Sequence, residues 1–549
     1  MIFNDITDIV PLLLYSEIHF RFFKGFPSLL FKKEPEIIFD MPRRIMHGRS
    51  LPLVLILNDC DQYPIKISQV SVRVWWHNTP PTVYSFSDSQ LKQYTYKHSL
   101  NNYSKIWYIL LEVDFPPDTE IHLTASLEFK EGNGKKGSCV NKIIYNDNLP
   151  TSSKKPFRCY IASSSYPGQK FCSYGDLHSH SLYSRSHVEF GPPIGILDKV
   201  AAASGLDFLA ITDHSYDLAC NKDNYLKQDP SLSLWKLYQE EIQSHTFSTI
   251  IVPGEEISCL NSQNKVVHLC ALNVKEYIPG TLDGARANTI FKKQLTVDEA
   301  VGQVQSQGGI AFAAHPGARS GLLQRLLLKR GDWSSNDLAK TQGIQAANGS
   351  FKKSWNRGKS LWVKLLQEGM RIPILAGNDA HGDFNRYRAI EKPFISVHED
   401  FERYLGFVRT GIYDKCSNLK QLLSAIKKGK TFVTNGPFVC LSSTASEKDS
   451  VISTSPLKKV PPKLHIVASS TKEFGMIKQV KVLSGQTGSP NETTVFFRDY
   501  KHDCYMAREH FSTSDLPLNC YLRVEVKGAT HNGHPVAAFT SACFIQKCP

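Results

Sequence analysis

The chain has 549 residues, of which 41% are hydrophobic and 21% are charged, and it carries a formal net charge of +13. This length exceeds what one hydrophobic core normally serves, so we expect about two to four domains. The composition is that of a globular protein in water and excludes a chain dominated by membrane-spanning segments.

Three further classes of protein are excluded by local features. The first ten residues contain Asp5 and Asp8 but no Lys or Arg, which is the wrong charge for a secretory signal. The apolar runs at 9–15 and 51–57 are far shorter than the roughly 18–20 residues of a transmembrane helix. The thirteen cysteines show neither CxxC nor CxxxC spacing, so no zinc ribbon or disulfide framework is indicated. We therefore expect reduced thiols and a cytoplasmic location.

The first part of the chain, residues 1–160, has the pattern of an antiparallel β-sandwich. Apolar and polar residues alternate in several short segments, and Pro-rich turns separate them. This region contains no catalytic constellation, and a polar stretch at 146–156 is the expected linker. The predicted strands are 50–57, 66–76, 106–113 and 120–129.

The middle of the chain alternates short apolar runs with helical patterns. Each run stops at His, Asp or Glu, as in Asp176-Leu-His178-Ser-His180, where side chains at i and i+2 share one face of a strand. Such runs are typical of buried parallel strands, and the alternation predicts a parallel barrel or an open sheet. The runs are 171–180, 208–214, 250–256, 310–316 and 372–381, and the helical patterns are 194–204, 231–243, 296–307 and 361–369.

The last part of the chain, residues 438–549, changes character again. A stretch rich in Ser, Thr, Lys and Pro at 442–462 predicts a connector. Short strand patterns follow at 464–468, 477–483, 494–497 and 520–526, and they predict a small β domain.

The polar residues at the ends of the middle runs form a set of metal-ligand types. Eight imidazoles and carboxylates that met at one mouth would repel one another or stay unsatisfied without cations among them. Imidazole together with carboxylate suits zinc, iron or manganese better than magnesium or calcium, and the set is large enough for two or three divalent ions. The predicted ligands are His178, His180, His214, Glu256, His268, His315, Asp379 and His381.

The order of these motifs resembles the PHP (polymerase and histidinol phosphatase) family of metal-dependent hydrolases, and it is most similar to the carbaryl-hydrolase-like branch. The resemblance covers residues 168–437 and runs through Asp176-Leu-His178-Ser-His180-Ser, Ala210-Ile-Thr-Asp213-His214, Pro253-Gly-Glu-Glu256-Ile-Ser258, His268, His315-Pro316 and Asp379-Ala-His381. It implies an α/β fold, a distorted seven-stranded β/α barrel of the TIM-like kind, between the two flanking β domains.

The resemblance also implies roles for individual residues. His178, His180 and Asp379 would hold one ion, His268 and His315 another, and Glu256 rather than Glu255 would bridge them. His214 and His381 would serve a third ion or the substrate. Asp213 would orient a ligand rather than act as a base, and the expected catalytic residues are Glu256, Asp213 and His381. The chain departs from the family at Arg185 and Ser186, where a ligand usually stands, with His187 displaced by one residue, and this leaves the third ion open.

The leading functional prediction is a phosphoesterase that attacks a small phosphate ester or nucleotide with a hydroxide formed between two ions. A carboxylester or carbamate hydrolase with the same centre and a non-catalytic, metal-stabilised scaffold are the alternatives.

The segment 319–371 is strongly basic, with eleven Lys or Arg against three Asp or Glu. It forms either a positive rim for an anionic substrate or a solvated helical face. Nucleic acid is possible but not favoured as a partner, no membrane is expected, and the oligomeric state stays open. The predicted substrate contacts are Arg185, Arg319, Asn348, Asn378 and Arg386.

Overall fold

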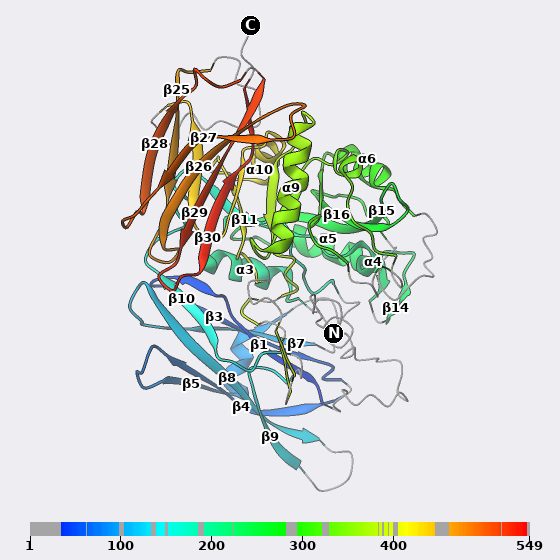
Figure 1. Ribbon diagram of the computed structural model, residues 1–549. Coiled ribbons are helices and arrows are strands. Elements are labelled where there is room, and N and C mark those ends of the chain that lie inside the picture. Colours follow the sequence, from blue (N-terminus) through cyan, green and yellow to red (C-terminus); the bar gives the residue numbers. More distant parts are fainter. Residues whose placement is uncertain are drawn as a thin grey trace.

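The computed structural model describes residues 34–545, apart from 62, 98–103, 133–138, 149–151, 185–190, 223, 281–293, 321–324, 326–328, 383, 387–388, 393–394, 399–403, 445–459 and 518. Three regions follow one another along the chain (Figure 1). The N-terminal sheets lie at one end, the helix-bearing middle lies beside the C-terminal sheets, and the middle region contacts both of the others.

Two sheets around one core make up the N-terminal region. Their inward side chains, such as Leu53, Val72 and Leu127, are fully buried in a shared hydrophobic cluster. The predicted strands at 50–57, 66–76, 106–113 and 120–129 correspond to β3, β4, β7 and β8, whereas β2 and β10 pair in parallel. The first sheet contains β1 (Glu36–Asp40), β3 (Leu51–Asn58), β7 (Lys105–Leu111) and β6 (Thr95–Tyr96); the second contains β2 (Arg44–Met46), β10 (Phe157–Ala162), β8 (Thr119–Gly132), β4 (Ile65–Trp75), β5 (Thr82–Ser87) and β9 (Cys139–Tyr145). A short helix, α2 (Asp88–Leu91), and a 3-10 turn, η3 (Lys92–Tyr94), connect β5 to β6.

A single large sheet links the middle and C-terminal regions. Its strands run in the order β19-β18-β17-β16-β15-β12-β11-β22-β23-β30-β29-β26-β27, with β31 paired to β29. The middle strands are β11 (Ser173–Asp176), β12 (Phe208–Ile211), β15 (Ile250–Leu260), β16 (Val266–Leu272), β17 (Ile310–Ala313), β18 (Ile344–Asn348), β19 (Ile374–Gly377), β22 (Arg409–Ile412) and β23 (Thr431–Thr434). The C-terminal strands are β26 (Met476–Gln486), β27 (Glu492–Asp499), β29 (Cys520–Ala529), β30 (Pro535–Thr540) and β31 (Cys543–Ile545).

Smaller sheets complete the strands that the structure describes. A three-stranded sheet of β24 (Phe438–Ser442), β25 (Lys463–Ser469) and β28 (Met506–Ser512) packs against the C-terminal part of the large sheet around a separate core. Two hairpins lie in the middle region, β13 (Cys220–Asn221) with β14 (Asn224–Gln228) and β20 (Ala389–Lys392) with β21 (Ile395–His398).

The predicted helices are confirmed, with small shifts at their ends. A capping box from Thr296 to Glu299 opens α6, and Gly205 takes a left-handed conformation directly after α3. The largest shift concerns the pattern at 361–369, which belongs to a longer helix that starts at Lys353. The helices of the middle region are α3 (Ile194–Ser204), α4 (Ser215–Leu218), α5 (Ser233–Ser244), α6 (Val297–Ser306), α8 (Ser335–Leu338), α9 (Lys353–Gln367) and α10 (Leu419–Lys427).

The prediction of a distorted seven-stranded β/α barrel is wrong. Strands dominate the described residues, and they join into large sheets rather than a closed barrel covered by helices. The hairpin from β15 to β16 adds an antiparallel strand that the predicted runs did not include, and β22 pairs antiparallel with β11. β19, at the edge of the large sheet, is joined to β22 by one side chain and not by a backbone ladder. The Thr410 hydroxyl accepts from the Ala376 amide and donates to Ala376 O. The sheet also continues across the predicted boundary at 437/438, because β23 pairs with β30.

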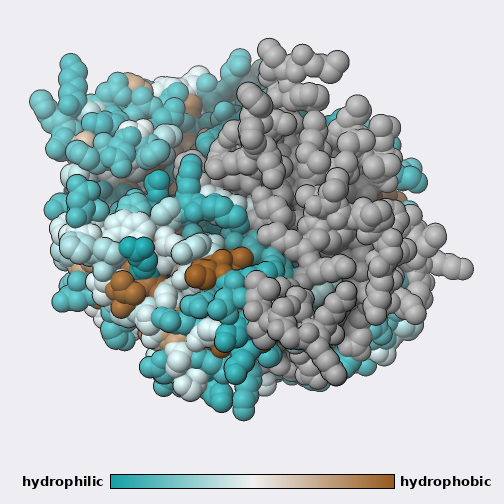
Figure 2. Space-filling model, turned by 90° about the horizontal axis from the view of Figure 1, so that it is seen from below, coloured by the Kyte–Doolittle hydropathy of each residue, from teal (hydrophilic) through white to brown (hydrophobic). Residues whose placement is uncertain are grey.

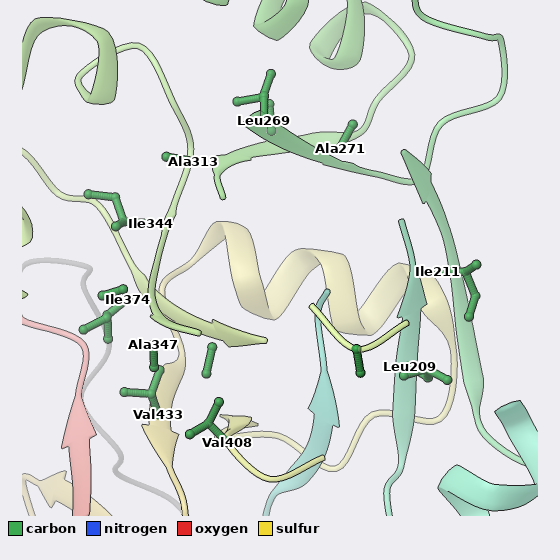
Figure 3. Close-up of a cluster of buried hydrophobic side chains, with 14 of the residues drawn as sticks. Leu209, Ile211, Leu269, Ala271, Ala313, Ile344, Ala347, Ile374, Val408 and Val433 are labelled. Carbon is green, nitrogen blue, oxygen red and sulfur yellow. The ribbon is translucent and has the colours of Figure 1, made fainter. Parts of the chain in front are cut away.

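Buried aliphatic side chains on the strands of the middle region share one cluster with side chains of α3, α6 and α9 (Figure 3). Leu209 and Ile211 from β12, Leu269 from β16, Ile344 from β18 and Ile374 from β19 belong to one cluster. This packing holds the strand ends of the middle region in fixed relative positions.

The surface at the N-terminal end of the molecule is largely hydrophilic where it is described, with small separate hydrophobic spots (Figure 2). Of the described helices, none has the length and apolar character needed to cross a bilayer.

Candidate metal centre

All eight predicted ligands meet at one place. His178 and His180 follow β11, His214 follows β12, and Glu256 and His268 lie within β15 and β16. His315 follows β17, and Asp379 and His381 follow β19. Their ligand atoms fall into three groups, each within 4.8 Å: His178, His180, Glu256 and Asp379; Glu256, His268 and His315; and His180, His214 and His381. We call these the central, the second and the third group.

The central group has the spacing of ligands around one ion. The Nε2 atoms of His178 and His180 are 3.2 Å apart, and each lies close to Oδ1 of Asp379, at 3.3 and 3.1 Å. Their distances to Oε2 of Glu256 are 3.5 and 3.4 Å. Four ligands in a tetrahedron around zinc at about 2.0–2.2 Å are separated by roughly 3.3–3.6 Å. The donor set and its spacing therefore fit a divalent ion.

Glu256 lies between two groups because its two oxygens face different partners. While Oε2 faces the central group, Oε1 lies 2.6 Å from Nδ1 of His268 and 3.3 Å from Nε2 of His315. Oε2 of Glu256 lies 2.9 Å from Nδ1 of His214. Both atoms are buried, and within the described part of the chain neither has a hydrogen-bond partner. Buried polar atoms that approach one another without bonding are the arrangement expected around cations.

In the third group the rings of His180 and His381 are stacked. The ring centroids of His180 and His381 are 3.9 Å apart with an interplanar angle of 7°, and that of His214 is 4.5 Å from His180. Arg185, Ser186 and His187, on which the question of a third ion turned, lie outside the described residues.

Backbone bonds between neighbouring strand ends fix these positions. The amide of His180 donates to Ala380 O, that of Asp379 donates to His178 O, and that of Glu256 donates to Asp213 O, at 2.9–3.0 Å. His315 and Asp379 have positive φ values of 32° and 54°. Left-handed backbone at non-glycine residues costs roughly 1–3 kcal/mol each, and it is typically retained where it aims a functional side chain.

Two histidines are oriented by polar side chains that sequence reasoning did not identify as part of the site. Nδ1 of His178 lies 2.8 Å from Oε1 of Gln345, and Nδ1 of His180 lies 2.9 Å from the Ser184 hydroxyl. That hydroxyl donates to Asp213 at 2.7 Å, so His180 must donate to it and turns an unprotonated Nε2 to the centre. The sequence signal for Gln345 is a polar residue within the short apolar run that forms β18, and the structure shows this side chain to be fully buried.

Asp213 faces away from the ligand groups. Its carboxylate accepts from the Ser181 amide at 2.7 Å, from the Ser181 hydroxyl at 2.6 Å and from Ser184. This geometry agrees with an orienting role through Ser184 and gives Asp213 no direct path to a reacting group.

The electrostatics of the cluster favour metal-ligand protonation states at Glu256, Asp379 and His180. At His178 burial lowers the pKa, but the neighbouring Cys270, Asp379 and Glu256 outweigh burial and raise the pKa well above its ordinary value. Burial alone raises the pKa of Glu256, but His268 and His178 hold it well below the usual value. Burial also raises the pKa of Asp379, but His178 and the hydrogen bond with His180 hold it well below its usual range. Burial and the neighbouring His381 and His214 lower the pKa of His180 well below its ordinary value. Anionic carboxylates and a neutral imidazole are the forms that bind metal.

Replacing Ser184 by alanine should weaken the central group. His180 would lose the acceptor that fixes its tautomer and ring orientation, and such outer partners typically contribute about 10- to 100-fold in metal affinity. Competition with a chromophoric chelator measures the effect. Ser306→Ala, on the exposed face of α6, is the control, and an affinity equal to that of the unchanged chain would contradict the role of Ser184.

The predicted substrate contacts are placed less uniformly than the ligands. Asn378 is fully buried and its amide donates to Asp176 and Val408 O, so it acts as a structural anchor. Asn348 is buried and accepts from Gln345 at 3.2 Å. Arg386 pairs with Asp40 at 3.3 Å, Arg319 is exposed, and Arg185 lies outside the described residues.

Part of the basic segment at 319–371 is neutralised locally. Arg325 pairs with Asp332 at 2.9 Å, Lys359 with Glu525 at 3.2 Å and Lys364 with Glu368 at 3.9 Å. These pairs favour the interpretation of a solvated or packed helical face for much of α9, and they leave Arg319 as an exposed cation four residues after the ligand His315.

Comparisons with known proteins assign no family to the chain. No family model and no curated protein matches it. Two crystal structures of a Parabacteroides merdae β-glucuronidase are similar at 8% identity with a TM-score of 0.17 and, for the form with glycerol in its active site, at 10% with a TM-score of 0.18. Each alignment covers 94% of this chain and 64% of the β-glucuronidase, so the chain spans less than two thirds of that protein's length. Likeness at these TM-scores carries no argument about fold or activity.

Proposed function

We propose that the chain is a metal-dependent hydrolase of the PHP-like kind and that it cleaves a small phosphate ester or nucleotide. The observation that carries the proposal is the central group, where two imidazole nitrogens and two carboxylate oxygens lie at ligand spacing and share Glu256 with a second group. Two or three zinc, manganese or iron ions suit these donors. A scaffold that needs metal only for stability would need one closed site and not adjoining groups.

Ions held by these groups would lower the pKa of water and offset negative charge on the ester oxygens. The chain's own residues supply the positioning. Glu256 spans two groups, Ser184 and Gln345 turn the Nε2 atoms of His180 and His178 inward, and Asp213 orients Ser184. Arg319 is the exposed cation that we assign to a substrate anion, and the third group, with His381, lies beside the central one.

The test is a steady-state assay of protein loaded with manganese or zinc on an aryl phosphate, an aryl phosphodiester and an aryl acetate. Turnover of either phosphate ester is the expected result. Turnover of the acetate alone would replace the proposal by the ester or carbamate hydrolase, and tightly held metal without any turnover would favour the scaffold.

Removal of metal with dipicolinate should abolish turnover and lower the unfolding temperature. An ion present at 100 times its Kd stabilises the folded chain by about 2.7 kcal/mol, which corresponds to roughly 5–10 °C in a domain of 150–250 residues. Differential scanning calorimetry before and after chelation measures the shift. Recovery of both properties with zinc or manganese but not with magnesium is the expected specificity, and an unchanged unfolding temperature would count against bound ions.

We also place the activity in the cytoplasm. The eleven cysteines whose side chains the structure describes are free thiols, in keeping with a reducing compartment. The proposed substrate is a small anion. Salt-dependent binding to single-stranded DNA is the check on the disfavoured nucleic-acid partner, and the absence of binding at low salt would remove it.

A further inference from the structure

The segment directly after the ligand His381 is held by the N-terminal sheets. Asp40, the last residue of β1, is 3% exposed, and its carboxylate accepts from the amides of Phe384 at 3.0 Å and Asn385 at 2.9 Å. It also accepts from the Met41 amide at 2.8 Å and pairs with Arg386 Nε at 3.3 Å.

Asn385 makes a second tie to the same region. Its Nδ2 donates to Arg158 O at 2.5 Å, and its Oδ1 accepts from the Arg158 amide at 3.2 Å. Because Arg158 belongs to β10, the Asn385 side chain pairs with the backbone of an N-terminal strand. We call Asp40, Arg158 and Asn385 the clamp.

The other end of this loop is fixed at the metal centre. Ala380 accepts from His180 and forms a parallel bridge with Ser179, and Nδ1 of His381 lies 3.0 Å from Asp379 O. Asp379 and His381 therefore stand on a short loop that the middle region holds at its start and the clamp holds a few residues later. The second group, formed by Glu256, His268 and His315, has no residue on this loop.

We propose that the N-terminal β region positions ligands of the metal centre. Through the clamp it holds Asp379 and His381 at ligand distance. A buried carboxylate that accepts several hydrogen bonds is costly to remove, since the donors left behind lose their partners. The proposal rests on the proposed function for its metal readout, and it assigns the N-terminal region a role that its lack of chemistry-bearing residues does not suggest. Asp40 and Asn385 are positioning residues, since neither touches the ligand groups.

The experiment uses the full chain with Asp40→Ala and, as a milder variant, Asn385→Ala. Zinc titrations against a chromophoric chelator should show affinity reduced about 10- to 100-fold for the central and third groups, while the second group keeps its ion. Hydrogen exchange of the amides at 379–386 should accelerate in both variants, with or without metal. Asp198→Ala is the matched control, because Asp198 is equally buried and accepts from the amides of Ser248 and Thr249, which belong neither to this loop nor to the clamp.

The possible outcomes separate the two proposals. If the unchanged chain binds no zinc, the proposed function fails, while the exchange rates still decide whether the clamp holds the loop. If zinc binds and both variants keep full affinity and slow exchange, the clamp proposal is overturned. Equal losses at all three groups in the variants and in Asp198→Ala would also overturn it, because they would reflect general destabilisation.

Discussion

Replacing Glu256 by glutamine is expected to remove the ions of both the central and the second group. Glutamine keeps the shape of the side chain, but one of its two terminal atoms becomes an amide nitrogen, which donates and cannot act as a ligand. In the unchanged chain Oε2 faces His178 and His180, whereas Oε1 faces His268 and His315, so whichever way the amide turns one group loses its acid ligand. The other group loses the negative charge. We expect activity to fall by more than the roughly 100-fold typical of outer residues.

Elemental analysis of Glu256→Gln measures this directly, since only an ion of the third group should remain. Glu255→Gln is the matched control. Glu255 is equally buried, but it points away from the ligands and accepts from the Ser215 hydroxyl at 2.8 Å and the Ile278 amide at 3.1 Å. Burial raises the pKa of Glu255 to about 8, so a neutral amide is a close substitute near pH 7. Full metal content in Glu256→Gln would show that Glu256 is not a ligand.

The gathering of the ligands could be predicted from the sequence, because most of them mark the point where an apolar run stops. His178, His214, His315 and Asp379 follow buried strands, and the ends of adjacent strands lie together whether or not the sheet closes. The meeting of these residues at the strand ends was therefore predictable, although the predicted barrel was wrong. Glu256 and Glu255 could be separated only by the resemblance to a family pattern, and the structure places Glu256 in the cluster.

Strand direction and long-range pairing could not be predicted in this way. An apolar run has the same composition in a parallel or an antiparallel strand, so nothing local distinguishes β16, which pairs antiparallel with β15 and β17. The join between β23 and β30 links segments about a hundred residues apart, and it carries the large sheet across the expected boundary. The bonds from Asp40 to Phe384 and Asn385 span still more of the chain. Such contacts depend on packing that no short pattern encodes.

The outer partners of the histidines were missed for a related reason. Gln345 and Ser184 are ordinary polar residues in sequence, and their importance comes from the nitrogen atoms that they face. Buried polar residues near predicted ligands are the signal to use, because each must find a partner.

Replacing Gly377 by alanine is expected to displace His178 from the central group. Gly377 ends β19, and a Cβ atom at this position would lie 2.5 Å from Cβ of His178, 2.9 Å from its backbone nitrogen and 3.0 Å from Nε2 of Gln345. Its φ is not positive, so the requirement for glycine is one of space and not of backbone conformation. Overpacking of this kind typically costs about 1–3 kcal/mol. A misplacement of about 1 Å at a working group can reduce activity by roughly 100-fold.

The prediction for Gly377→Ala is therefore lower stability together with weaker zinc binding at the central group, measured by urea unfolding and chelator competition. Gly302→Ala supplies a control of opposite sign. Gly302 lies in α6, where a Cβ atom would meet nothing within 4 Å, so alanine should stabilise the helix by about 0.5–1 kcal/mol and leave zinc binding unchanged. If Gly377→Ala bound zinc as tightly as Gly302→Ala, His178 would have room to move without loss, and the tight fit between β19 and the ligand would not be what positions it.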